Sequence, residues 1–582
     1  MKLTLDKAIK TAIKKTLQDL GFPETAISLE HPAVESHGDY SSNIALTTFE
    51  RAKGQGLRDK GKTPREFAQT IAEKLQNNKE LKKIVSKIEV AGPGFINFFL
   101  NDKSLIIELE EILKEKNGYG SSNSGKGKTM VIDYSAPNIA KRFTVGHLRS
   151  TIIGQAVYNI YKFLGWKCIG DNHLGDWGTQ FGKMIVAIRK WAGKSVDELT
   201  VDEMESLYVR FHQEAETNKE LDEEARAAFK ALEDGKKEER ELWKKLVIRS
   251  IEEFQKIYDL LGVKIDEAYG ESSYEKMMPS IIDEAKKKGV AIKSEGALII
   301  PYPNDALPPS MILKSDGGTT YLTRDLATIK FRKEKWSPDL MIYEVGSEQT
   351  LYWRQAFWAV ELLGWAKRNQ FFHIPHGLIR LKEGKISTRK GNAIKLEQVL
   401  AEAIDRAKKF NDDSEISKMV GIGAVKYNDL KHSPSTGYVF DWAEMINLDG
   451  NSGPYLQYTY ARCKSVLSKS GGLPLSLSPY PLALNSEELA ILRFIYRFPE
   501  VVQIAAIQYS PNLVCTFLYE LAQRFNTFYN KHRIIPSDLS NHSSHFNHSN
   551  HSAAFRLLLT SSVSQVLKNG LTLLGIQTPE KM

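Results

Sequence analysis

The sequence predicts an α/β protein: a domain built on a parallel sheet, with a small α+β domain before it and an all-α domain after it. Three observations predict this class. Strand-like and helix-like segments alternate over 129–178, amphipathic helices and a Gly-Pro-Gly turn mark 1–116, and the pattern is helical from about 413. A length of 582 residues leaves room for roughly three or four domains.

The first predicted domain covers 1–116. Apolar residues at helical spacing predict a helix over 5–20, and similar patterns predict helices over 64–76 and 103–116. Between the second and third helices, the segment 87–100 predicts two strands around the Gly-Pro-Gly turn. This domain is therefore expected to combine helices with a small sheet.

A Gly- and Ser-rich stretch, 117–128, is predicted to be a linker. Gly120, Gly125 and Lys126 have the spacing of a phosphate-binding P-loop. However, Gly127 stands where that motif has Ser or Thr, and a strand is predicted to follow, whereas a P-loop precedes a helix. We therefore favour a linker over a P-loop.

The second predicted domain covers 129–412. A strand over 129–137, a helix over 151–164 and a strand beginning at 168 give the order of a parallel sheet. The stretch 191–260 contains 12 Lys and Arg against 19 Asp and Glu, which predicts helices with a solvated face. We expect a helical insertion over about 191–290.

Strand-like segments return after this insertion, which places it inside the α/β domain. They are 297–301, 311–314, 341–345 and 371–374.

The third predicted domain, 413–582, reads as a helical bundle. Residues 451–582 have 11 basic and 6 acidic side chains, and Tyr, Phe, Asn and Gln are frequent. Within it, His542, His545, His548 and His551 recur every third residue in an Asn/Ser background. Metal binding is conceivable, but a solvated loop is favoured because this background offers no packing to fix ligand geometry.

Composition restricts the classes of protein. The net charge is +8, from 79 basic and 71 acidic residues, which is compatible with an anionic partner but does not identify one. The three cysteines, Cys168, Cys463 and Cys515, have neither zinc-ligand nor disulfide spacing, so a reducing, cytoplasmic location is expected. We expect no signal peptide, no membrane span and no protein-bound structural metal.

The segment 134–154, YSAPNIAKRFTVGHLRSTIIG, carries the first chemical signal. A strand ends, a Pro-containing turn follows, and Gly146 and His147 open a helix. Helix N-termini bind phosphates, Gly146 leaves space for a flat base, and Lys141, Arg142 and Arg149 add positive charge. A strand–turn–helix with an incidental His is the alternative.

The segment 380–396, RLKEGKISTRKGNAIKL, carries the second signal. It contains six basic residues, two glycines and a Ser-Thr pair, which predicts a mobile cationic loop. Such a loop suits a leaving polyphosphate, although a solvated surface loop is the common alternative.

Together these segments resemble the class I aminoacyl-tRNA synthetases, and within them the arginyl-tRNA synthetase family. TVGH (144–147) resembles the HIGH signature and KISTR (385–389) the KMSKS loop. Thr144 departs from the usual first His of HIGH. The resemblance extends in order through further motifs: SAPNIAK (135–141), NHLGDWGTQFG (172–182), YLTRDLA (321–327), AVKYNDL (424–430), YVFDW (438–442), GPYLQYTYAR (453–462) and LLGIQTPEKM (573–582).

The resemblance implies a Rossmann-like catalytic domain and a two-step ligase reaction. Arginine would attack the α-phosphate of ATP, with Mg²⁺ accompanying the nucleotide, and the arginyl group would pass to the 2′-hydroxyl of the terminal adenosine of tRNA(Arg). No nucleophilic side chain is required, because positioning and electrostatics carry such chemistry. The partners implied are arginine, ATP and tRNA(Arg), and a monomer is expected.

The resemblance also implies roles for individual residues. Acceptors for the guanidinium of arginine are needed, and a carboxylate is the most selective of them. The candidates around arginine are Asp133, Asn138, Tyr321, Asp325 and Gln349. Those for ATP are Thr144, Gly146, His147 and Lys385, and the catalytic candidates are His147, Lys385, Ser387 and Arg389.

For tRNA, the resemblance implies contacts from the first and last domains. Phe95 and Asn97 suit base stacking and hydrogen bonding, although Phe95 equally fits a core position. Tyr458, Arg462 and Met582 are the candidates in the helical domain. Two rival interpretations are an RNA-binding relative that has lost its chemistry and a nucleotidyltransferase acting on a small acid. His147 and Asp325 oppose the first, and the helical domain is superfluous to the second.

Overall fold

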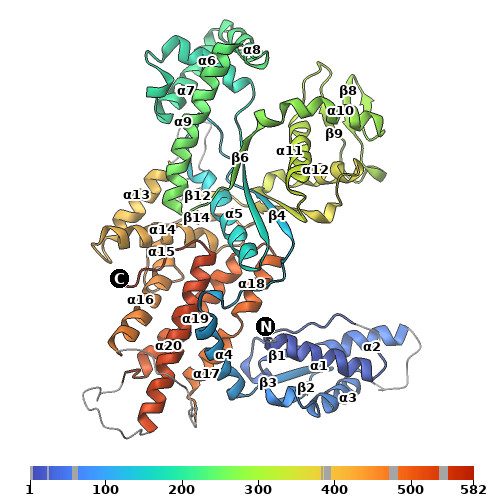
Figure 1. The fold of residues 1–582 in the computed structure, drawn as a ribbon, viewed down its shortest axis with the longest axis vertical. Helices are drawn as coiled ribbons and strands as arrows, with labels where there is room; N and C mark the ends of the chain where they lie inside the picture. Colours follow the sequence, from blue (N-terminus) through green and yellow to red (C-terminus); the bar gives the residue numbers. More distant parts are fainter. Residues whose placement is uncertain are drawn as a thin grey trace. The chain divides into compact units, whose positions relative to one another are not determined.

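A computed structural model describes residues 4–22, 25–54, 63–381, 384–385, 395–470, 483–535 and 548–582, and these form two compact units. The first unit contains 1–119, 466–497 and 523–566. The second contains 120–465, 498–522 and 567–582. Figure 1 follows the chain by colour from its N-terminus to its C-terminus.

The first unit begins with a three-stranded antiparallel sheet and its covering helices, as the sequence predicts. The strand order is β1-β3-β2, and Ser41 lies opposite Asn97 in the register. Thr63 caps the helix that begins at Pro64. Proline is favoured at the first position of a helix because its missing N–H would have no partner there. The elements are α1 (Leu5–Asp19), β1 (Tyr40–Ser42), α2 (Ile44–Gly54), α3 (Pro64–Gln76), β2 (Val85–Ala91), β3 (Phe95–Leu100) and α4 (Asp102–Glu115).

Helices from the C-terminal part of the sequence complete this unit. They are α17 (Ser486–Ile495), the C-terminal part of α19 (Asn512–Lys531) and the N-terminal part of α20 (His548–Leu573). Helix α17 packs against α4, and Asn485 caps it by accepting the N–H of Glu488 at 2.8 Å.

The second unit contains a five-stranded sheet in which every neighbouring pair is parallel, with order β11-β10-β4-β5-β6. Helix α5 connects β4 to β5, so the predicted strand–helix–strand unit and the Rossmann-like fold class are confirmed. Met130, Ile132 and Ile342 are fully buried in the sheet. The elements are β4 (Thr129–Asp133), α5 (Val145–Phe163), β5 (Lys167–Leu174), β6 (Glu267–Gly270), β10 (Leu340–Gly346) and β11 (Phe371–His376).

The predicted helical insertion is present but ends earlier than expected. Four helices, shown in green in Figure 1, precede β6, so the parallel sheet resumes at Glu267 although we expected helices until about 290. The four residues of β6 are too few and too polar to show a strand pattern. The helices are α6 (Thr179–Trp191), α7 (Val201–Thr217), α8 (Glu220–Glu233) and α9 (Lys237–Leu261).

Two of the predicted strands belong to a separate antiparallel sheet, which corrects their expected return to the main sheet. Glu295 and Gly296 both have positive φ and join two strands in a tight hairpin. The elements of this region are α10 (Met278–Lys287), β7 (Ile292–Ser294), β8 (Ala297–Ile300), β9 (Ser310–Leu313), α11 (Tyr321–Trp336) and α12 (Thr350–Leu362).

The rest of the second unit is helical, as predicted, except for a small sheet. Strand β14 interrupts the region predicted to be all helix and pairs in parallel with β12. The elements are β12 (Ile379–Leu381), β13 (Gly384–Lys385), α13 (Leu396–Ala407), α14 (Ser414–Leu430), β14 (Tyr438–Phe440), α15 (Trp442–Met445), α16 (Gly453–Lys469) and α18 (Phe498–Ile507). A search of the described helices found none that is both long and apolar enough to cross a bilayer.

A buried lysine joins three parts of this unit. Lys426 on α14 is 1% exposed and donates to the carbonyl oxygen of Leu261 at 2.7 Å and to that of Gly575. Burial lowers the pKa of Lys426 to about 7.

Candidate functional site

The candidate site lies at the carboxyl edge of the parallel sheet, where the order of the strands reverses. The chain runs outward from β4 to β5 and β6, then continues with β10 on the other side of β4. In such sheets, ligands bind at this reversal, outside the carboxyl ends of the strands. The segments that follow β4 and β10, and the start of α5, are therefore the place to examine.

Helix α5 starts with a side-chain cap that fixes a histidine. Thr144 donates its backbone N–H to Nδ1 of His147, and its hydroxyl contacts the same nitrogen, both at 3.1 Å. Because Nδ1 accepts, the ring proton is on Nε2. Burial lowers the pKa of His147 to about 4, so the ring is neutral near pH 7. His147 therefore provides one N–H donor at the positive end of a helix.

Gly146 leaves open space beside this histidine. It is exposed, and a Cβ atom there would meet only the Thr144 hydroxyl, at 3.4 Å. The backbone at Gly146 therefore leaves room for a flat ring, which stays a prediction.

The cations expected beside this helix are engaged elsewhere. Arg149 is 1% exposed and bonds to Asp429, so it does not contribute a free charge to a phosphate site. Nε of Arg142 pairs with Asp202 at 2.8 Å and with Glu205 at 2.6 Å. The expectation that Arg149 adds positive charge to this site was wrong, because a charge pattern cannot distinguish a buried guanidinium from an exposed one.

Asp325 and Tyr321 lie four residues apart on α11, which places both on one face of that helix. Tyr321 is 72% exposed, whereas Asp325 is partly buried and accepts a hydrogen bond from the Tyr352 hydroxyl. Burial raises the pKa of Asp325 to about 6, and the bond from Tyr352 opposes this rise. A bound cation stabilises the ionised form of a carboxyl group whose pKa is raised by burial.

Glu271 is a further acid of this region that sequence reasoning missed. It follows β6, and burial raises its pKa to about 7, with Asp325 adding to the rise and Arg324 opposing it. Nη1 of Arg324 lies 3.6 Å from the Glu271 carboxylate, too far for a hydrogen bond. The sequence gives no motif for Glu271; only the parallel pairing of β6 with β5 brings it to this edge.

Asp133 ends β4 and is held by a buried arginine. Nη2 of Arg332 donates to Oδ2 of Asp133 at 2.8 Å, and its Nε donates to Asp171 at 2.7 Å. All three side chains are buried. Within the described residues, Oδ1 of Asp133 is buried and has no hydrogen-bond partner, so one oxygen of this carboxylate is unpaired.

Asn138 and Gln349 follow β4 and β10. Asn138 forms a parallel bridge with Gly175, where a Cβ atom would come within 2.4 Å of the Asn138 side-chain oxygen. A side chain at 175 would therefore require the Asn138 side chain to move. Gln349 ends the short 3-10 helix Ser347–Gln349 and is exposed.

The cationic loop is only partly within the described residues. The backbone of Lys385 lies in β13, opposite Arg380 of β12. Ser387 and Arg389 lie outside the residues that the structure describes.

Comparison with known proteins gives matches over the whole chain. A family described as "tRNA synthetases class I (R), catalytic domain" matches residues 108–442. "Arginyl tRNA synthetase N terminal domain" matches 5–100, and "DALR anticodon binding domain" matches 456–582. The chain belongs to the arginyl-tRNA synthetase family.

Individual relatives of this family match equally fully. An arginine–tRNA ligase of Halothermothrix orenii is 40% identical, with 98% of each chain covered, and one of Clostridioides difficile is 39% identical, with 99% covered. The arginyl-tRNA synthetase structures of Plasmodium falciparum and Thermus thermophilus share the fold, each with a TM-score of 0.81, 24% identity and full coverage of both chains. The predicted family is confirmed.

The residues predicted to contact tRNA differ in how far their side chains are exposed. Phe95 is 39% exposed, so it is not a core residue. Asn97 is buried and accepts a hydrogen bond from the Ser41 hydroxyl at 2.7 Å. In the second unit, the Arg462 guanidinium lies 4.8 Å from the centre of the Tyr458 ring, and Met582 is partly exposed.

Two further sequence features can be placed within the family's fold. The Gly-rich stretch 117–128 precedes β4, so it lacks the helix of a P-loop, and the P-loop alternative is wrong. His548 and His551 start α20, while His542 and His545 lie outside the described residues. A search of the described residues found no group of three His, Cys, Asp or Glu placed to hold a metal ion.

Proposed function

We propose that the chain is an arginine–tRNA ligase. It activates L-arginine with ATP to arginyl-adenylate and pyrophosphate, and transfers the arginyl group to the 2′-hydroxyl of the terminal adenosine of tRNA(Arg). The carrying observation is its match to arginine–tRNA ligases over 98% of both chains, at 40% identity.

Arginine selection rests on Asp325 together with Glu271. Burial raises the pKa of both carboxyls, and a guanidinium bound between them would offset that burial. A neutral amino acid could not do so, and lysine lacks the planar fork that binds a carboxylate through two N–H groups. Asp133, Asn138, Tyr321 and Gln349 are proposed to complete the amino-acid site.

ATP is proposed to bind at the start of α5 with its Mg²⁺, which is part of the nucleotide substrate because a hard cation screens the phosphates. The adenine would lie against Gly146, and the Nε2–H of His147, held by Thr144, would donate to a phosphate oxygen. Lys385, Ser387 and Arg389 are proposed to face the departing pyrophosphate. The arginine carboxylate attacks the α-phosphorus as the bond to pyrophosphate breaks, so no side chain acts as nucleophile.

We assign the tRNA to the outer domains: Phe95 and Asn97 in the first, and Tyr458, Arg462 and Met582 in the last. The proposed domains are 1–116, a linker over 117–128, a catalytic domain over 129–412 with its helical insertion, and a helical domain over 413–582. We further propose that the enzyme acts as a monomer in the cytoplasm.

The test is the attachment of labelled arginine to tRNA(Arg) by purified protein with ATP, with lysine as the competing amino acid. Attachment of arginine and not lysine is expected. If well-folded protein forms no arginyl-tRNA, the proposal is wrong.

Asp325→Asn tests the amino-acid site. Loss of a charged hydrogen bond of about 1.5–3 kcal/mol predicts a roughly 10- to 150-fold rise in KM for arginine with little change in KM for ATP. Asp283→Asn, an exposed change on α10, is the matched control and should leave both constants unchanged. An unaltered KM for arginine in Asp325→Asn would remove Asp325 from the site.

A further inference from the structure

Asp176 is a buried aspartate close to Glu271, and it belongs to none of the proposed arginine, ATP or tRNA sites. It lies in the motif NHLGDWGTQFG (172–182), two residues after β5 ends, and is 4% exposed. Its Oδ1 accepts the backbone N–H of Ser272 at 2.9 Å, and its Oδ2 accepts the Ser272 hydroxyl at 2.6 Å. Both carboxylate oxygens thus bind one residue, which directly follows Glu271.

The register of the parallel sheet brings these two segments together. Leu174 and Gly270, the last residues of β5 and β6, lie opposite each other, so the chain leaves both strands at the same level. Gly270 allows the carboxylate to approach, since a Cβ atom there would lie only 2.2 Å from the Asp176 carboxyl carbon. The ring N–H of Trp243 on α9 donates to the backbone carbonyl oxygen of Asp176 at 2.8 Å. Both the backbone and the side chain of Asp176 are therefore held.

Asp176 caps the short 3-10 helix Glu271–Met277. Gly270 stands at the cap position of this helix and has no side chain that could accept a hydrogen bond. The first N–H groups of a helix lack partners within it, and a carboxylate is a strong acceptor for them. Glu271 therefore lies between two anchored residues, because Gly270 is paired within the sheet and Ser272 is bonded to Asp176. This anchoring sets where the Glu271 carboxyl group lies.

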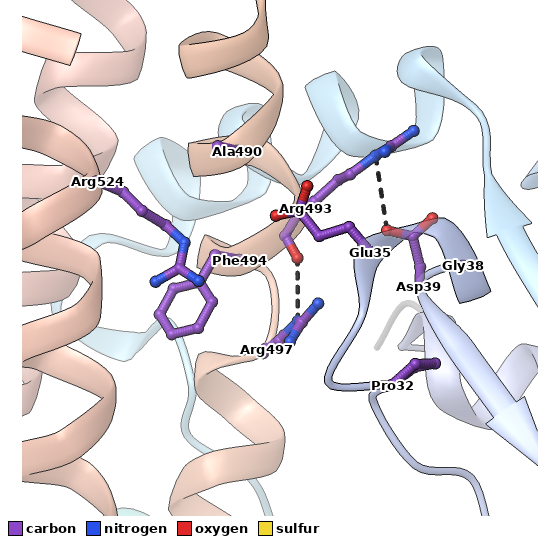
Figure 2. A pocket seen from close by; sticks show the side chains of 9 residues that line it. All are labelled: Pro32, Glu35, Gly38, Asp39, Ala490, Arg493, Phe494, Arg497 and Arg524. Atoms are coloured by element: carbon purple, nitrogen blue, oxygen red, sulfur yellow. Dashed lines mark hydrogen bonds and ion pairs between the residues drawn. The ribbon is translucent and has the colours of Figure 1, made fainter. Parts of the chain in front are cut away.

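The charge of Asp176 has no cation beside it. Asp39 in the first unit is also buried and accepts a backbone N–H, but Nε of Arg493 lies 3.8 Å from its carboxylate, as Figure 2 shows. Among the residues that the structure describes, no Lys, Arg or His forms an ion pair with Asp176. Burial raises the pKa of Asp176, and the bonds from Ser272 oppose this rise. A buried carboxylate without a cation costs stability, and such groups gather at functional sites.

We propose that Asp176 is a positioning residue for arginine binding, because its bonds to Ser272 hold Glu271 where it can accept the substrate guanidinium. The inference rests on the proposed function, which supplies arginine as the substrate. The charge of Asp176 also acts on this site. Burial raises the pKa of Glu271, Arg324 opposes the rise, and Asp325 and Asp176 add to it. A bound guanidinium would offset the repulsion among these three carboxylates.

The test measures kcat and KM for arginine in the aminoacylation of tRNA(Arg) at about pH 8.5, where Glu271 is ionised. Asp176→Ala should raise KM for arginine at least about fivefold, with kcat and KM for ATP within about twofold of the wild type. Ser272→Ala keeps the backbone N–H bond to Asp176, so its rise should be smaller. Asp413→Ala is the matched control, because Asp413 likewise accepts two backbone N–H groups, at the start of α14, and its loss should leave KM for arginine unchanged.

A double-mutant cycle with Glu271→Gln distinguishes positioning from general damage to the protein. If Asp176 acts through Glu271, adding Asp176→Ala to Glu271→Gln should raise KM for arginine by less than about a further twofold. Independent effects would multiply instead, and that result would overturn the inference.

Asp176→Asn gives a readout that a purely structural role would not change. Asparagine keeps an acceptor for the Ser272 N–H but removes the charge that helps to raise the pKa of Glu271. KM for arginine should therefore fall at lower pH in Asp176→Asn than in the wild type, whereas Ser272→Ala should show no such shift. A pH profile that stays in place in Asp176→Asn would overturn the electrostatic effect of Asp176.

The same assay separates this inference from the proposed function. If the wild type charges tRNA with arginine and Asp176→Ala, folded by circular dichroism, keeps the wild-type KM for arginine, the positioning role is wrong and the ligase proposal survives. If well-folded wild type forms no arginyl-tRNA, the ligase proposal fails and the positioning role fails with it.

Discussion

Arg149→Met should destabilise the second unit strongly, because Arg149 neutralises a buried carboxylate and holds two loops. Its Nε donates to Asp429 at 3.2 Å, and its Nη1 donates to the carbonyl oxygens of Gly377 at 2.9 Å and Thr436 at 2.7 Å. These carbonyls lie just before β12 and β14, which pair with each other. One side chain thus ties the helix that carries His147 to the base of the sheet from which the cationic loop extends.

The size of the stability loss follows from the burial of both side chains. Asp429 is 0% exposed and Arg149 is 1% exposed, so removing the guanidinium leaves a charge in the interior. Breaking a buried ion pair by removing one partner costs about 3–5 kcal/mol, a large part of the roughly 5–15 kcal/mol that stabilises a protein domain. Replacing both partners costs less, because no charge is left unpaired. Arg149→Met combined with Asp429→Asn should therefore recover part of the loss.

The loss of stability in Arg149→Met should also depend on pH, in a direction that the pKa of Asp429 predicts. Burial raises the pKa of Asp429, and Arg149 opposes that rise. Without Arg149 the folded-state pKa rises further above the unfolded value of about 4. Ionised Asp429 then destabilises the fold above that unfolded value, and the penalty decreases as pH falls and the folded carboxyl is protonated. The deficit of Arg149→Met should be larger at pH 8 than near pH 5.

Urea unfolding followed by circular dichroism measures this effect, with KM for ATP as the functional readout. Arg406→Met is the matched control, because Arg406 pairs with Glu402 on an exposed helix face and its loss should cost about 0–1 kcal/mol. A loss in Arg149→Met no larger than in the control, or no recovery in the double variant, would refute the reasoning. A rise in KM for ATP is expected because the start of α5 shifts.

Three further predictions concern the site and its frame. Affinity for arginine should rise with pH between about 5.5 and 8. Asp325 and Glu271, with pKa values of about 6 and 7, must ionise to hold a guanidinium. A KM for arginine that does not change with pH would contradict this. Thr144→Val should lower the free energy of unfolding by about 1 kcal/mol and raise KM for ATP, because the Thr144 hydroxyl contacts His147. Thr144→Ser keeps the hydroxyl, so its stability and its KM for ATP should match the wild type. Equal behaviour of the two variants would show that the hydroxyl does not cap the helix. Lys426→Met should speed hydrogen exchange near the C-terminus, because two backbone carbonyls lose their donor, and unchanged exchange there would show that the lysine does not hold the segment.

Much of the fold could be predicted because periodicity and order carry it. The helices over 5–20 and 64–76 follow from apolar spacing, and the parallel sheet follows from the strand–helix–strand order at 129–178. Strand β6 could not be predicted, since EAYG shows no alternation and its role depends on pairing with β5. The segments at 297–301 and 311–314 read correctly as strands, but only their antiparallel pairing with each other places them in another sheet.

Some residues of the candidate site could likewise be predicted from the sequence, and others could not. The motif YLTRDLA pointed to Asp325, and helix α11 places it at the carboxyl edge of the sheet. Glu271 gave no signal, because its only relevant property is nearness to Asp325 and Arg324 in the folded chain. Arg149 gave a misleading signal, because its charge was visible in the sequence and its burial was not.

Four carboxylates near the same sheet edge fall into two classes by their partners, not by their residue type. Asp133 and Asp171 share the buried guanidinium of Arg332, which links the end of β4 to the middle of β5. Within the described residues, Asp325 accepts its hydrogen bond from a hydroxyl, and Glu271 has Arg324 at 3.6 Å. Burial raises the pKa of Asp325 to about 6 and that of Glu271 to about 7. The first pair has its cation within the fold, while the second pair would be stabilised by the guanidinium of the proposed substrate. An acid already neutralised inside the protein gains little from a substrate guanidinium, and for this reason the proposed selection of arginine is assigned to Asp325 and Glu271.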